Sequence, residues 1–157
     1  MVGRNPLDVA VTPDGARAYV TNADSNSVSV ISTGTNSVIA HVPVGAHPLY
    51  VAITPSGTRA YVADAGANSV TVIDTANNTI AATLRVGAIP VDLSISPDGA
   101  YAYVTNAGSK SVSVIDTATN TVMGHRPGGI YSSSCFHQSR RSARIRDQCW
   151  LELGLSH

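Results

Sequence analysis

A unit of 42 residues occurs three times in succession, and this repetition constrains the fold more than any other feature of the chain. Equivalent residues recur in phase, among them Pro6, Pro48 and Pro90; Gly15, Gly57 and Gly99; Tyr19, Tyr61 and Tyr103; and Ile31, Ile73 and Ile115. A fixed period of this length is typical of an array built from one supersecondary unit. The repeats therefore predict an architecture, and by themselves they predict no reaction.

Each repeat has the pattern of four short strands separated by turns. In the first repeat, residues 6–12 alternate apolar side chains with small or polar ones, and Pro-Asp-Gly at 13–15 has the composition of a tight turn. Further strands are expected at residues 16–22, 27–31 and 37–44. β-Branched residues dominate and no helical period appears. Four short antiparallel strands in about 40 residues are typical of a propeller blade.

The composition of the strands indicates that both faces of each sheet are covered. The repeats contain no glutamate and one lysine, Lys110, whereas a sheet with one wet face would carry charged side chains outside. We therefore expect an all-β fold, a partial β-propeller of three four-stranded antiparallel blades with an unrelated C-terminal tail. The blades are expected at about residues 3–44, 45–86 and 87–127, and the tail at 128–157.

Two of the repeats carry a short motif that extends this interpretation. Residues 18–22 and 102–106 contain Tyr-Val-Thr-Asn, and residues 9–15 and 111–117 match its flanks. The chain resembles the YVTN family of β-propeller repeats over residues 3–125, with Tyr-Val-Ala-Asp at 61–64 as a departure. The family is similar to archaeal surface-layer proteins, exported bacterial proteins, and lactonase-like or cytochrome-associated propellers. The resemblance thus implies an exported or cell-surface location, although the N-terminus shows no signal-peptide pattern.

The composition changes abruptly after the third repeat. Both cysteines, the only tryptophan, the only phenylalanine and the only glutamate follow residue 129. Residues 1–125 carry five basic and eight acidic side chains, whereas residues 126–157 carry five and two. We expect this segment to be disordered or to lie over the third blade, and not to form a fourth blade. Two interpretations remain open: a foreign or frameshifted reading frame after truncated repeats, or a genuine tail with its own role.

Three in-phase positions on the first strand of each blade are the candidate ligand-binding residues: Asp8, Tyr50 and Asp92. The first strand of a propeller blade lines the central channel, so these side chains could gather around a ligand, and paired carboxylates can bind a cation or share a proton. In the alternative interpretation, each aspartate bonds backbone amides at the start of a strand. The tyrosine in the middle repeat interrupts any acidic ring.

Other polar side chains have simpler interpretations. Arg17 and Arg59 follow the first turn of their repeats and are expected to be exposed edge charges that discourage strand pairing. Asn22, Asp64 and Asn106 begin the turn after the second strand and are expected to cap it. The sequence therefore predicts no metal site and no cofactor.

Two functions fit these observations. The first is a non-catalytic scaffold, an interaction module of the cell surface or envelope that forms part of a larger propeller. Its partners would be a protein, an envelope component or further copies of the chain, with no membrane span and no nucleic acid. The alternative is part of a lactonase-like propeller hydrolase. Three nearly identical repeats offer little for acid–base or nucleophilic chemistry, so we expect a scaffold rather than an enzyme.

Overall fold

The computed structural model describes residues 1–127, and these form twelve strands in three antiparallel sheets. Blade 1 contains β1 (Pro6–Val11), β2 (Arg17–Asn22), β3 (Ser27–Ser32) and β4 (Ser37–Pro43). Blade 2 contains β5 (Pro48–Ile53), β6 (Arg59–Asp64), β7 (Ser69–Asp74) and β8 (Thr79–Arg85). Blade 3 contains β9 (Pro90–Ile95), β10 (Tyr101–Asn106), β11 (Ser111–Asp116) and β12 (Thr121–Pro127). The three expected four-stranded sheets are confirmed, whereas the tail lies outside the described residues.

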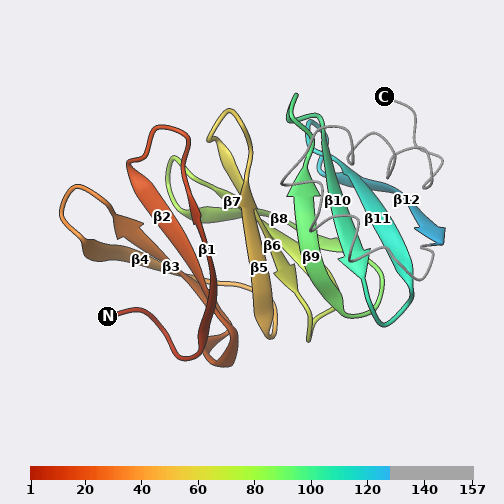
Figure 1. The fold of residues 1–157 in the computed structure, drawn as a ribbon, viewed down its shortest axis with the longest axis horizontal. Coiled ribbons are helices and arrows are strands. Elements are labelled where there is room, and N and C mark those ends of the chain that lie inside the picture. Colours follow the sequence, from red (N-terminus) through yellow and green to blue (C-terminus); the bar gives the residue numbers. More distant parts are fainter. Residues whose placement is uncertain (128–157) are drawn as a thin grey trace, which may run out of the picture.

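Each sheet is a meander in which strands adjacent in sequence pair with one another. The three sheets follow one another along the long axis of the molecule (Figure 1). Their first strands are neighbours, because β1 contacts β5 and β5 contacts β9. One short 3-10 helix, η1 (Ala23–Ser25), replaces the plain turn after β2 in blade 1. The arrangement makes β1, β5 and β9 the inner strands and β4, β8 and β12 the outer ones.

The turn between the first two strands of each blade needs glycine. Gly15, Gly57 and Gly99 have φ of 73°, 74° and 75°, in the left-handed region that residues with a Cβ rarely adopt. In each turn the glycine amide donates a 2.8 Å hydrogen bond to the carbonyl three residues earlier. The tight turn predicted from Pro-Asp-Gly at residues 13–15 is therefore confirmed, and its glycine has positive φ.

The hydrophobic core lies between the blades. At the junction of blades 1 and 2, Tyr19, Val28 and Val30 of blade 1 pack against Val51 and Val62 of blade 2. The junction of blades 2 and 3 repeats this arrangement, with Tyr61, Val70, Val72, Leu93 and Val104 in the equivalent places. Blade 2 is covered on both faces, and its strands carry valine and small residues on both, as the composition indicates. Blade 1 departs from this expectation, because Leu7, Val9 and Val11 on β1 are exposed.

Candidate functional site between the blades

A set of polar contacts recurs where one blade meets the next, near the turns at one end of the sheets. The phenol hydroxyl of Tyr19 donates a 2.8 Å hydrogen bond to Oδ1 of Asn78, and that of Tyr61 donates an equivalent bond of 2.8 Å to Asn120. Each bond joins the second strand of one blade to the last turn of the following blade. Burial raises the pKa of both tyrosines, so both remain donors at neutral pH.

The two arginines after the first turns belong to the same contacts. Nη1 of Arg59 donates a 3.3 Å hydrogen bond to the carbonyl of Thr117, and Nη1 of Arg17 donates to the carbonyl of Thr75. Both arginines are half-buried. The expectation that they are exposed edge charges is wrong, because they begin β2 and β6, which have a paired strand on each side. Their charge is used to join the blades.

Backbone turns also meet across the junctions. A Cβ built on Gly57 would lie 3.2 Å from Cδ of Pro13, and one built on Gly99 would lie 3.3 Å from Cδ of Pro55. The same construction on Gly15 meets nothing within 4 Å. In blades 2 and 3 the turn glycine thus has two roles. It adopts the positive φ, and its lack of a Cβ allows the proline ring of the preceding blade to pack closely against it.

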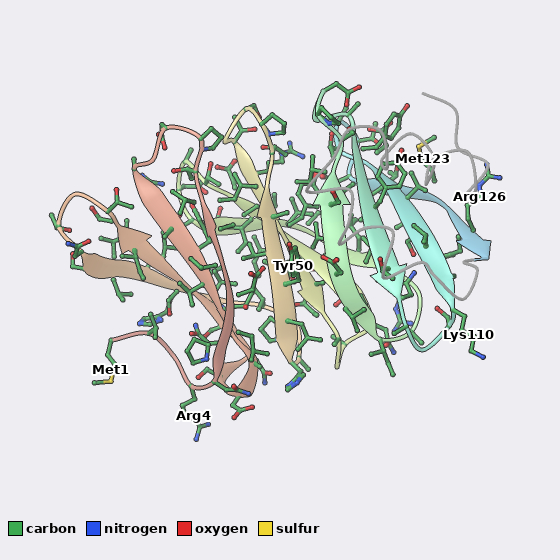
Figure 2. The ribbon with its side chains drawn as sticks, in the orientation of Figure 1. Met1, Arg4, Tyr50, Lys110, Met123 and Arg126 are labelled. Atoms are coloured by element: carbon green, nitrogen blue, oxygen red, sulfur yellow. The ribbon has the colours of Figure 1, made fainter. Side chains whose placement is uncertain are left out.

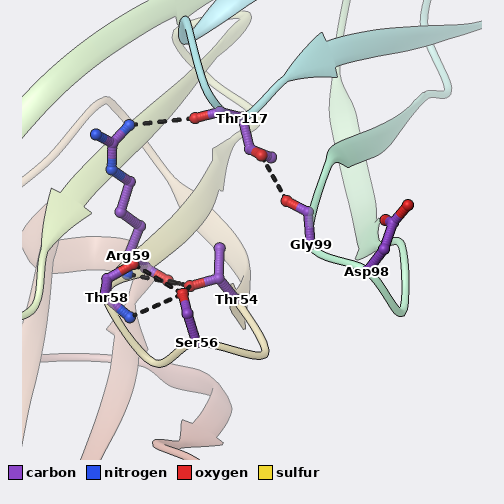
Figure 3. Close-up of a pocket in the computed structure, with 7 residues that line it drawn as sticks. All are labelled: Thr54, Ser56, Thr58, Arg59, Asp98, Gly99 and Thr117. Carbon is purple, nitrogen blue, oxygen red and sulfur yellow. Dashed lines mark hydrogen bonds between the residues drawn. The ribbon is translucent and has the colours of Figure 1, made fainter.

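Between the turns of blades 2 and 3 lies a pocket of about 260 Å³. Figure 3 shows the side chains that line it, which are mostly hydroxyl-bearing: Thr54, Ser56, Thr58, Arg59, Asp98, Gly99 and Thr117. The hydroxyls are already linked, because Ser56 Oγ lies 3.1 Å from Thr54 Oγ1 and 2.8 Å from Thr58 Oγ1. Thr117 Oγ1 donates a 2.5 Å bond to the carbonyl of Gly99.

Asp98 supplies the only carboxylate among the pocket's lining residues. The hydroxyl of Ser96 donates to Asp98 Oδ1 at 2.5 Å, and the amide of Ala100 donates to the same atom at 2.9 Å. These bonds stabilise the ionised form and lower the pKa of Asp98. The lining therefore combines an anion, a guanidinium and several hydroxyls, a chemistry suited to hydrogen bonding with a hydroxylated ligand. Sequence reasoning missed this pocket, because its residues lie on two different repeats.

The three candidate ligand-binding residues lie on the inner strands, as expected from their phase. Oδ2 of Asp8 accepts a 3.0 Å hydrogen bond from the backbone amide of Val51, on the inner strand of the next blade. Tyr50 packs against the core between blades 2 and 3, near the middle of the molecule in Figure 2. Asp92 is half-buried on β9. Asp8 thus bonds a backbone amide, but across a junction, and a ligand at the three positions stays a prediction.

A second in-phase set is fully buried at the other end of the sheets. Asn22 and Asn106 donate from Nδ2 to Ser29 and Ser113 at 2.9 Å and 2.8 Å, whereas Asp64 accepts a 2.6 Å bond from the Thr71 hydroxyl. Burial raises the pKa of Asp64 to about 6, against the lowering effect of hydroxyl and amide donors. These side chains bond to the third strand of their own blade, so they hold the sheet together around the turn.

The glycine that opens each blade is explained by this buried set. A Cβ on Gly45 would lie 2.6 Å from the side chain of Asp64, and one on Gly87 would lie 2.6 Å from Cγ of Asn106. Real Cβ atoms do not approach so closely, so only glycine fits. The segment that enters each inner strand is thereby packed against the end of the second strand of the same blade.

The described residues offer no metal centre and no membrane helix. Within residues 1–127, no three histidine, cysteine, aspartate or glutamate side chains gather closely enough to hold a metal ion. In the same span, no helix is long and apolar enough to cross a bilayer.

Comparisons with known proteins give a fold and no family. No family model matches the chain, and no curated protein matches it. Among solved structures, the chain is similar to hydrazine synthase of Kuenenia stuttgartiensis, with a TM-score of 0.75 and 31% identity over 80% of this chain and 36% of that one. It is also similar to the WD40 repeats of RRP9, with a TM-score of 0.75 and 17% identity over 82% of this chain and 40% of that one. The chain has a β-propeller fold.

A third solved structure is also similar to the chain. A functionally unknown protein from Desulfotomaculum acetoxidans DSM 771 matches with a TM-score of 0.66 and 20% identity, over 77% of this chain and 41% of that one. The chain therefore spans between 36% and 41% of the length of these three solved structures. The propeller supplies a rigid frame with loops at both ends of the blades.

Proposed function

We propose that this β-propeller chain is a non-catalytic interaction scaffold of the cell surface or envelope, working as part of a larger propeller. The observation that carries the proposal is the duplicated junction. The arginine and tyrosine side chains Arg17, Arg59, Tyr19 and Tyr61 bond one blade to the next at equivalent atoms in both copies. Repeated use of the same groups for the same contact supports a structural role for them.

The surface offered to a partner lies at the turns between blades 2 and 3. The pocket there presents hydroxyls, the Arg59 guanidinium and the Asp98 carboxylate, which suit a polyhydroxylated envelope component. Blade 1 differs at the same phase, where Asp14 and Ala16 replace Ser56 and Thr58. A partner that binds through these hydroxyls would therefore use the second junction and not the first.

Binding to isolated cell-envelope polysaccharide tests this proposal. The full chain should co-sediment with the insoluble polysaccharide. Thr58 is exposed and lines the pocket, so the tryptophan of Thr58→Trp should fill the pocket and abolish most of that binding. Ala16→Trp, at the equivalent exposed position of blade 1, is the matched control and should bind like the wild type. Equal binding by both variants would contradict the assignment of the surface.

The hydrolase alternative is tested separately with aliphatic and sugar lactones, with and without Ca²⁺. We expect no hydrolysis above the uncatalysed rate. Turnover that requires the chain, and that Asp8→Asn removes while the fold is kept, would overturn the non-catalytic proposal. It would also assign chemistry to the inner strands, where the sequence places its candidate ligand-binding residues.

A further inference from the structure

The turn that joins β7 to β8 in blade 2 contains the tripeptide Asn77-Asn78-Thr79. An asparagine, then any residue except proline, then serine or threonine is the pattern at which N-linked glycans are attached. Asn77 is the only asparagine in the sequence with a serine or threonine two residues later. The three repeats therefore share one turn, and the pattern occurs in the middle one alone.

The geometry of the turn leaves the side-chain nitrogen of Asn77 available. Asn77 and Thr79 are both exposed. The Thr79 hydroxyl donates a 2.6 Å hydrogen bond to Oδ1 of Asn77, and the Thr79 amide donates a 3.2 Å bond to the same atom. Within residues 1–127, Nδ2 of Asn77 makes no hydrogen bond. One end of the amide is thus fixed by the turn, and the end that would carry a glycan is open to an enzyme.

The turn itself does not need an asparagine at this position. Thr35 in blade 1 and Thr119 in blade 3 occupy the phase of Asn77. The Thr35 hydroxyl lies 2.7 Å from Oγ of Ser37, and the Thr119 hydroxyl lies 2.8 Å from Oγ1 of Thr121. Threonine therefore makes the same contact across two residues in the other blades, so stability of the turn does not explain the asparagine of blade 2.

The turn holds Asn77 in a fixed place at the outer end of the first junction. Asp74 fixes the backbone, because its Oδ1 accepts a 2.8 Å bond from the Ala76 amide and its carbonyl accepts a 2.9 Å bond from the Asn78 amide. The Asn78 side chain is bonded to the Tyr19 hydroxyl of blade 1. Ala76 and Asn77 are exposed, so a bulky group on Asn77 displaces no core side chain. The pocket described above lies at the other junction.

We propose that Asn77 is a site of N-linked glycosylation, modified by a transferase that uses a glycan carried on a lipid diphosphate. In the transfer, Nδ2 of Asn77 forms a bond to C1 of the glycan while the bond between C1 and the phosphate oxygen breaks. The lipid diphosphate leaves with the bonding electrons, and Nδ2 gives up one of its two protons to solvent. The inference rests on the cell-surface location proposed above, because this modification belongs to secreted proteins.

Translation of the full chain into endoplasmic-reticulum microsomes, behind a cleavable export signal, tests the proposal. We expect a glycan on the wild type. An amidase that releases N-linked glycans converts the asparagine that carried them to aspartate, and peptide mass spectrometry should place that aspartate at residue 77. Asn77→Thr, which introduces the residue of the other two blades, should lose the glycan and keep the fold. Thr79→Ala should also lose the glycan, and the conservative Thr79→Ser should retain it.

A gain of modification provides the second test. Thr119→Asn creates the same pattern in the equivalent turn of blade 3 and should add a second glycan, whereas Thr119→Gln, its matched control, should add none. The proposal is overturned by a wild type without a glycan, by a glycan that persists in Asn77→Thr, or by a glycan at another residue. Because the export signal is supplied, these outcomes are independent of the proposed location. Failure to bind envelope polysaccharide would count against the proposed function and not against Asn77.

Discussion

Replacing Asp64 with asparagine, the residue at this phase in the other two repeats, should stabilise the protein at neutral pH and leave it unchanged in acid. Asp64 is fully buried, and burial raises its pKa from 3.8 to about 6. A raised pKa in the folded state means that ionisation costs more there than in the unfolded chain. Ionisation of Asp64 therefore lowers the free energy of unfolding of the wild type, and the Asp64→Asn variant is free of this penalty because asparagine does not ionise.

The size of this penalty follows from the shift of the pKa. A rise from 3.8 to about 6 is roughly two units, and each unit corresponds to about 1.4 kcal/mol, so the penalty reaches about 3 kcal/mol. Below pH 3.8 the carboxyl is protonated in both states and the penalty is absent. It grows as the pH rises and is complete once the pH exceeds about 6, when Asp64 is ionised in both states.

The surrounding hydrogen bonds can accept the substitution. The Thr71 hydroxyl now donates to Asp64, and in the variant it would accept from the new amide, as Ser29 and Ser113 do in the other blades. The Gly45 amide, which bonds the Asp64 carboxylate, could turn to the Thr71 hydroxyl, as its counterparts turn to serine. Because this rearrangement of hydrogen bonds costs part of the roughly 3 kcal/mol that is gained, we expect the free energy of unfolding to rise by about 2 kcal/mol.

Urea unfolding followed by circular dichroism, repeated from about pH 4 to pH 8, measures the effect. The difference in free energy of unfolding between Asp64→Asn and the wild type should rise from near zero at about pH 4 to a plateau above about pH 7. The reciprocal variant Asn106→Asp is the control, because it introduces the same buried carboxyl into blade 3. It should lose stability as the pH rises. A difference that stays constant with pH would refute the assignment of the penalty to ionisation of Asp64.

Three further predictions test the junctions and turns. Gly57→Val and Gly15→Val should both lose stability through the positive φ, and Gly57→Val should lose about 1 kcal/mol more because only Gly57 meets the Pro13 ring. Equal changes in midpoint temperature for the two variants would contradict this. Tyr61→Phe should cost about 1 kcal/mol, measured by urea unfolding, through loss of its bond to the asparagine of the next blade. Ile89→Asn should stabilise by about 1 kcal/mol in the same assay, because Ile89 has φ of 52° and asparagine tolerates that region better.

The sequence predicts the content of each blade well, because that content depends on local patterns. Alternation, the Pro-Asp-Gly turns and the spacing of 42 residues place four strands per repeat, and the structure agrees to within one or two residues at most ends. The positive φ of the turn glycines follows from the same local chemistry. These features can be predicted without knowing which residues pack against the blade.

The contacts between blades are less accessible from the sequence. Tyr19 and Asn78 lie 59 residues apart, so a pattern read within one repeat cannot join them. Arg17 reads as a surface charge because nothing nearby in sequence accepts its bonds, whereas its acceptor is the carbonyl of Thr75 in the next repeat. A search for pairs that recur together at the repeat spacing would have found the tyrosine–asparagine pair, since Tyr61 and Asn120 have the same separation.

The junction contacts also bear on how such a protein grows in evolution. Blade 2 contains both sides of the interface, with Tyr61 and Arg59 on one face and Asn78 and the carbonyl of Thr75 on the other. A tandem duplication of one unit therefore adds a blade together with an interface that already fits, and no new contact has to arise by selection. Divergence is then limited to positions outside the shared contact, such as Ser56 and Thr58 at the turn, where copies can acquire different partners while the array stays intact.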